Sequence, residues 1–93
     1  MTRAAIAKRI QDRARQVLVR AGRHWPHVRR LVPVAEIVAA VGDCPGDPRD
    51  YDLDHVEPVA RFDLAYDDQV RAAFHPSNFR WLRAGRNRSD GAR

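Results

Sequence analysis

Hydrophobic residues in the first part of the chain recur at helical spacing, while arginines lie largely off that stripe. This pattern predicts an amphipathic helix from Thr2 to Ala21, with Gly22 as its stop. A charged helical face is usually solvated, although these arginines could also follow a phosphate backbone. The residues that define the apolar stripe are Ile6, Ile10, Val17 and Leu18.

A second helix is predicted from Pro33 to Gly42, with proline near its start and glycine at its end. Residues 23–27, which include Pro26, are interpreted as a break between the two helices. The connecting segment is long and contains proline, so the pair matches a DNA-binding helix-turn-helix poorly. Residues 43–48 are dense in proline, glycine and aspartate and predict a loop.

The second half of the chain has a different pattern. Tyr51–Val56 alternates polar and apolar residues and predicts a short strand, ended by Pro58. Asp67–Phe74 predicts a brief helix, and Phe79–Leu82 a second strand. Residues 86–90 are expected to open a last short helix. The fold class expected is therefore α+β, with helices in front and a strand, helix, strand, helix order behind.

The bulk composition indicates one small domain with a polyanionic partner. The 93 residues suffice for a single core and therefore for one domain. This domain has a helical part at 1–42 and a part with the predicted strands at 50–93. The net charge is +5, and every basic residue except Lys8 is arginine, which suits phosphate contacts. A GC-rich genome would produce the same arginine bias without any ligand, so the charge only permits nucleic acid as partner.

Cys44 is the only cysteine, which excludes an intramolecular disulfide and a multi-cysteine zinc ribbon. No stretch has the apolar length needed to span a bilayer, so no membrane association is expected. These features predict a protein of a reducing cytoplasm.

Three polar features of the second half point to phosphodiester chemistry: adjacent Asp54 and His55, then Asn78, then Asn87. Hydrolysis needs a base for the attacking water and positive charge near the oxygens that become more negative. A histidine supplies the base. A hard cation supplies the charge, and Mg²⁺ prefers oxygen ligands such as a carboxylate and an asparagine carbonyl.

The order of these motifs resembles the HNH endonucleases, particularly their compact phage forms. The resemblance covers roughly the last 40 residues, the length of one supersecondary unit. It is carried by Leu53-Asp54-His55-Val56-Glu57-Pro58, Phe62-Asp63-Leu64, Ala73-Phe74-His75, Asn78-Phe79-Arg80-Trp81-Leu82 and Arg86-Asn87-Arg88.

The resemblance implies a role for each motif residue. Asp54 would be the first metal ligand, and His55 the general base that takes a proton from water. Asn78 would be mainly structural, pinning the loop that orients His55. Asn87 would be the second metal ligand, in place of the histidine of other members. The implied fold is a ββα-metal motif, a two-stranded hairpin and a helix around one divalent ion, with Mg²⁺ expected and Mn²⁺ or another ion as alternatives.

Two features of the strand bear on this interpretation. Neighbours on a regular strand point to opposite faces, so the strand must bend or end for Asp54 and His55 to reach one region. The resemblance also implies a backbone carbonyl that holds the second imidazole nitrogen and fixes the tautomer. His55 could alternatively be a satisfied interior histidine, and Asn78 and Asn87 could be turn or cap residues.

Basic side chains near the motif are candidates for DNA contacts, because positive charge would hold the scissile strand. His75 could touch phosphate or cap a helix. Five aromatic residues are expected in the core, because so small a chain needs them inside: Trp25, Phe62, Phe74, Phe79 and Trp81. The candidate DNA-binding residues are His75, Arg80, Arg83, Arg86 and Arg88.

The sequence also raises a zinc site, a partner protein and a second function as alternatives. His24, His27 and Cys44 raise zinc, but Pro26 argues against a regular helix between the histidines, and no structural zinc is expected. The few residues after Asn87 include Gly91, a poor helix former, so a homodimer or a protein partner could complete the fold. An inactive DNA-binding or packaging accessory protein with the same fold is the alternative function.

Overall fold

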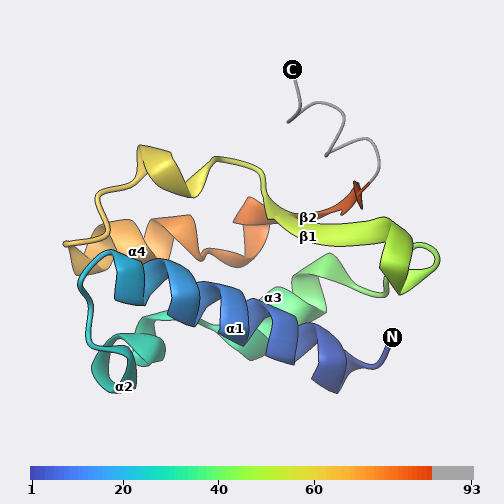
Figure 1. Cartoon of the computed structure of the whole chain (residues 1–93), viewed down its shortest axis with the longest axis horizontal. Coiled ribbons are helices and arrows are strands. Elements are labelled where there is room, and N and C mark those ends of the chain that lie inside the picture. Colours follow the sequence, from blue (N-terminus) through green and yellow to red (C-terminus); the bar gives the residue numbers. More distant parts are fainter. Residues whose placement is uncertain (85–93) are drawn as a thin grey trace.

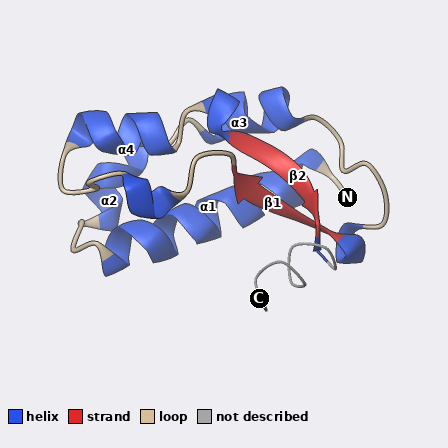
Figure 2. Ribbon diagram, turned by 90° about the horizontal axis from the view of Figure 1, so that it is seen from above, coloured by secondary structure: helices blue, strands red, loops and turns tan. Residues whose placement is uncertain are grey.

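The computed structural model describes residues 1–84 of the chain. Within them it is a small α+β protein with four α-helices and one two-stranded antiparallel sheet. Helix α1 (Arg3–Arg20) runs along the molecule, with α2 (Trp25–Val28) and α4 (Asp67–Ala73) near one end and the strands toward the other (Figures 1 and 2). None of the helices in this part of the chain has the length and apolar character needed to cross a membrane.

Helix α1 forms where the apolar periodicity predicts it. The Thr2 hydroxyl caps its start by accepting a hydrogen bond from the Ala5 backbone N–H at 3.1 Å. At its end the N–H groups of Gly22 and Arg23 donate to the carbonyls of Val19 and Leu18, which is a Schellman motif. Gly22 adopts φ +84°, a left-handed conformation that glycine tolerates best. The predicted stop at Gly22 is confirmed.

The predicted break at residues 23–27 is partly wrong, because α2 forms one helical turn there and continues into a 3₁₀ turn at Arg29–Leu31. Pro26 lies in the first turn of α2, where its missing N–H has no helical partner to lose. Helix α3 (Val34–Val41) follows as predicted, and Gly42 ends it with φ +67°.

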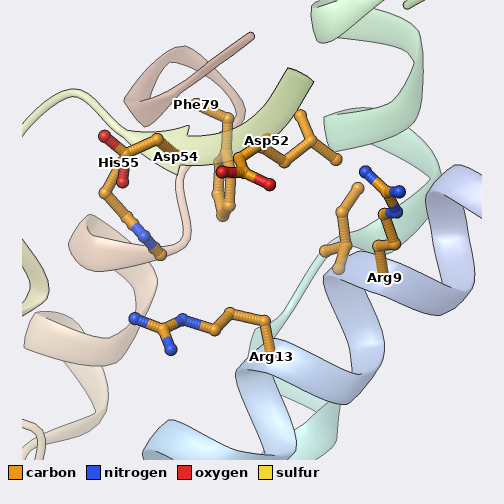
Figure 3. A pocket seen from close by; sticks show the side chains of 8 residues that line it. Arg9, Arg13, Asp52, Asp54, His55 and Phe79 are labelled. Atoms are coloured by element: carbon orange, nitrogen blue, oxygen red, sulfur yellow. The ribbon is translucent and has the colours of Figure 1, made fainter. Parts of the chain in front are cut away.

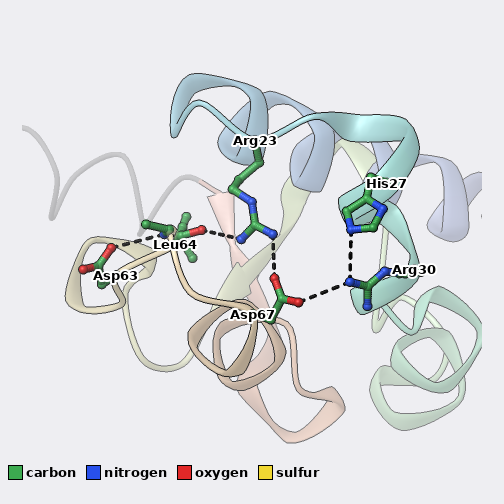
Figure 4. Close-up of polar contacts among 7 residues, drawn as sticks. Arg23, His27, Arg30, Asp63, Leu64 and Asp67 are labelled. Atoms are coloured by element: carbon green, nitrogen blue, oxygen red, sulfur yellow. Dashed lines mark hydrogen bonds and ion pairs between the residues drawn. The ribbon is translucent and has the colours of Figure 1, made fainter.

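An ion-pair cluster joins the start of this helical segment to the second half of the chain (Figure 4). Arg23, whose side chain is 16% exposed, donates to the Leu64 carbonyl at 2.8 Å and to the Asp67 carboxylate at 2.6 Å. Arg30 contacts the same carboxylate at 3.2 Å. The Arg23 donors therefore fix the segment before α4 against the end of α1.

The sheet consists of β1 (Tyr51–His55) and β2 (Phe79–Arg83), with α4 between them in sequence. The register pairs Tyr51 with Arg83 at one end and His55 with Phe79 at the other. Helix α3 packs against α1 and against β2. The aromatic residues expected in the core do pack there: Phe74 is fully buried, and Trp25, Phe62, Phe79 and Trp81 pack against the buried cluster.

The stripe of α1 yields a first prediction. Leu18 is fully buried, whereas Val19 is 50% exposed. Leu18→Ala should lower the free energy of unfolding by about 2–5 kcal/mol, because it removes core contacts and leaves a cavity. Val19→Ala, the matched control, should change it by less than about 0.5 kcal/mol. Urea unfolding followed by circular dichroism measures both, and equal losses would contradict this orientation of α1.

Candidate functional site

The candidate site is a cavity of about 360 Å³ between α1 and the hairpin (Figure 3). Helix α1 contributes two basic side chains, β1 contributes its polar residues, and β2 contributes one aromatic ring. The lining residues are Arg9, Ile10, Arg13, Asp52, Leu53, Asp54, His55 and Phe79.

His55 is the last residue of β1 and is buried, with 8% of its surface exposed. Its position is set by strand alternation, which directs Leu53 and His55 to the face that packs on the core. The ring lies edge-on to Phe74 at a centroid distance of 5.3 Å and tilted against Phe79 at 4.5 Å. The imidazole therefore has an apolar wall on one side and the cavity on the other.

The Nε2 atom of His55 is shielded from solvent and has no hydrogen-bond partner among residues 1–84. The backbone carbonyl expected to hold the second ring nitrogen is thus not found in the described part of the chain. Burying a polar nitrogen without a partner costs about 1–3 kcal/mol. Such a group is rare in a native fold, and a catalytic role is one of the reasons for which it is kept.

The surroundings of His55 disfavour its charged form. Burial lowers the pKa of His55 below its ordinary value of 6.5, and the positive charge of Arg13 lowers it further. The negative charge of Asp54 opposes these two effects and raises the pKa. The imidazole is therefore neutral near pH 7 and able to accept a proton.

Asn78 fixes the loop that follows His55. Its side-chain Oδ1 accepts from the Glu57 N–H at 2.7 Å, and its Nδ2 donates to the carbonyls of Glu57 at 3.2 Å and Ala73 at 2.9 Å. Its own carbonyl accepts from the Val56 N–H at 2.9 Å. One buried amide thus connects the exit of β1, the end of α4 and the start of β2, which is the bracing geometry expected of this residue.

Asp54 leaves β1 on the opposite face from His55, and the strand ends directly afterwards, as the sequence required. Across the hairpin Asp54 is paired with Arg80, and its carboxylate lies 3.9 Å from the Arg80 guanidinium. Both side chains are about half exposed, so this ion pair contributes little to stability. The carboxylate remains accessible at the edge of the cavity.

The other predicted contact residues do not gather at one place. Arg80 and Arg83 lie on opposite faces of β2, and Arg83 pairs with Tyr51 at the end of the hairpin away from His55. The expected cluster around the site is therefore divided. His75 caps the 3₁₀ turn Pro76–Asn78, because its Nδ1 accepts from the Ser77 N–H at 3.1 Å.

The remaining predicted residues, Arg86, Asn87 and Arg88, lie outside the described residues. Of the two histidines considered for zinc, His27 contacts an arginine instead: its Nε2 atom lies 3.2 Å from an Nη atom of Arg30. No group of three or more His, Cys, Asp or Glu side chains in residues 1–84 is arranged to hold a metal ion.

Sequence reasoning did not assign Arg9, Arg13 or Asp52 to the site. The first two are four residues apart, so they lie on one edge of α1, and this spacing was visible in the sequence. The sequence spacing could not show that this edge of α1 faces β1.

Comparison of the chain with protein-family models, with curated proteins and with solved structures gives no match.

The Asn78 brace yields a second prediction. Asn78→Ala should lower the free energy of unfolding by about 1–3 kcal/mol, because it leaves the Glu57 N–H and the Ala73 carbonyl unpaired. Hydrogen exchange of the Glu57 amide should accelerate more than that of the α1 amides. Ser77→Ala, an exposed neighbour, is the control and should leave the Glu57 amide protected. Unchanged exchange in Asn78→Ala would contradict the bracing role.

The lowered pKa of His55 yields a third prediction, on how stability depends on pH. Because folding lowers this pKa, the unfolded chain binds the proton first as pH falls, so His55 destabilises the fold below about pH 6.5. The destabilisation is complete once pH is below the folded pKa. His55→Phe removes it, whereas all other acidic and basic groups are retained.

The measurement is the difference in free energy of unfolding between the parent and His55→Phe, taken from urea titrations across pH 4–8. This difference should be constant above the ordinary pKa of 6.5 and should shift in favour of the variant below it. A difference independent of pH would show that folding leaves the His55 pKa unchanged.

Proposed function

We propose that this chain is a metal-dependent HNH-type endonuclease that hydrolyses phosphodiester bonds in DNA. The observation that carries the proposal is His55, a buried imidazole with a lowered pKa at the wall of a cavity that also contains arginine side chains. A neutral base beside positive charge is the combination that attack of water on a phosphodiester requires.

His55 would take the proton from the attacking water. Of its two nitrogens, Nε2 is shielded from solvent, so Nδ1 is the proposed proton acceptor. A ring held between Phe74, Phe79 and the Asn78-braced loop cannot reorient freely. Fixing the base in this way lowers the entropic part of the barrier.

Three features of the described residues support the proposal of a ββα-metal motif. The two strands are antiparallel, α4 is inserted between them, and Asn78 supports the turn beside His55. The helix that would carry Asn87 belongs to the part of the chain outside residues 1–84. The ββα-metal assignment is therefore part of the proposal.

A divalent cation fits the donor available at this edge of the cavity. Asp54 offers an accessible carboxylate whose ion pair with Arg80 is weak and easily exchanged. Mg²⁺ commonly takes one or two protein carboxylates and completes its shell with water and substrate oxygens. Asp54, with Asn87 as its proposed partner, would hold the ion, which supplies positive charge next to the phosphate.

One observation favours the alternative, an inactive DNA-binding or packaging accessory protein. The Asp54 carboxylate already has a cationic neighbour in Arg80. If that pair persists in solution, the carboxylate is neutralised without a metal. The net charge of +5 would then serve binding alone.

Plasmid cleavage tests the proposal. Supercoiled plasmid is incubated with the parent, with His55→Ala and with His24→Ala, in Mg²⁺ or Mn²⁺ and in a chelator control. His24 is exposed and lies outside the cavity, so His24→Ala should cut like the parent. His55→Ala should be slower by about 10²–10⁴-fold, the usual contribution of a general base.

Equal cutting by His55→Ala and the parent would refute the catalytic assignment. Absence of cutting by every variant, together with a gel shift of the same DNA, would support the accessory-protein alternative. Cutting that persists in the chelator would remove the metal from the proposal.

A further inference from the structure

The arginine on α1 that faces His55 has no role in the HNH-like half of the chain. Arg13 is exposed, lines the cavity, and holds its guanidinium on the opposite side of the cavity from β1 (Figure 3). In the same view the His55 ring points toward it. The two groups come from distant parts of the sequence and meet only through the packing of α1 on the hairpin.

We propose that Arg13 is a phosphate-binding residue, and that it holds the DNA backbone in the cavity beside His55. This inference rests on the proposed function for the choice of DNA as ligand. It goes beyond that function because it assigns a substrate contact to the N-terminal helix.

Comparison with Arg9 shows why Arg13 is the residue for this role. The two Nη atoms of Arg9 donate to the backbone carbonyls of Tyr51 at 3.3 Å and Pro48 at 3.4 Å, which ties α1 to the start of β1. Arg13 forms no hydrogen bond or ion pair with another residue of the described chain, 1–84. Its guanidinium therefore keeps its donors for a ligand.

The acidic residues of the cavity do not neutralise Arg13. The Asp54 carboxylate lies 3.9 Å from the Arg80 guanidinium, and neither Asp52 nor Asp54 forms an ion pair with Arg13. The unpaired Arg13 guanidinium therefore leaves positive charge at this end of the cavity. A phosphate group would compensate this charge.

The shape and chemistry of the cavity favour a backbone phosphate over other anions. A planar guanidinium binds two phosphate oxygens at once, which fixes the orientation of the group as well as its position. A volume of about 360 Å³ suits one nucleotide unit and is too small for a folded partner. Contacts of this kind position the strand without reading its sequence.

Fluorescence anisotropy of a fluorescein-labelled DNA duplex, with chelator to prevent cutting, measures binding separately from catalysis. Arg13→Ala should raise the Kd roughly tenfold, the usual loss for one charge-assisted contact. The slope of log K against log salt should fall by about 0.9, as expected for one lost phosphate contact. Arg13→Lys keeps the charge without the fork and should give an intermediate Kd.

Arg15→Ala is the matched control. Arg15 is exposed on the same helix, carries the same charge and does not line the cavity. It should bind DNA nearly as well as the parent. Both variants replace exposed side chains, and unchanged thermal unfolding of each would show that binding is compared between intact folds.

The outcomes separate this inference from the proposed nuclease activity. Weaker binding by Arg13→Ala alone, with no cutting by any protein, would support the phosphate site and refute the nuclease. Cutting by the parent, with unchanged DNA binding by Arg13→Ala, would support the nuclease and refute the phosphate site at Arg13. Equal weakening by Arg13→Ala and Arg15→Ala, or no binding by the parent, would overturn the assignment to Arg13.

Discussion

The buried stripe of α1 is the constraint on which the rest of the structure depends. Ile6, Ile10, Ala14 and Leu18 are at most 2% exposed, and they form the surface on which the later elements pack. A two-stranded hairpin is at best marginally stable in water by itself. The hairpin therefore needs α1 and α3, and the same packing that stabilises it decides which edge of α1 faces β1.

A second constraint is polar and acts locally. The apolar contacts place His55 between Phe74 and Phe79, but the path of the chain after it depends on the Asn78 amide. A buried amide with both ends satisfied allows one backbone arrangement, because any other leaves polar groups unpaired. The imidazole is thus oriented by aromatic packing on its sides and by hydrogen bonds in the adjoining loop.

Local patterns predicted the elements well, because helix and strand periods are local properties. The expected helix Thr2–Ala21 is observed as Arg3–Arg20, and the expected strand Phe79–Leu82 as Phe79–Arg83. The failures have physical causes. Proline usually indicates a break in a helix, but the first turn of a helix accepts it, and Pro26 lies in the first turn of α2. Nearness in sequence suggests that Arg80 and Arg83 lie together, but strand alternation places them on opposite faces.

The cavity itself could not be predicted, since its walls come from segments that only tertiary packing brings together. Arg13 and His55 belong to different halves of the chain, and no local pattern encodes their meeting. The alternation of β1 then gives adjacent residues different surroundings. His55 is removed from water and loses basicity, whereas Asp54 stays hydrated beside Arg80. A helix that supplies a wall and a cation to this cavity is part of the candidate site, so the motif-bearing half alone would lack both.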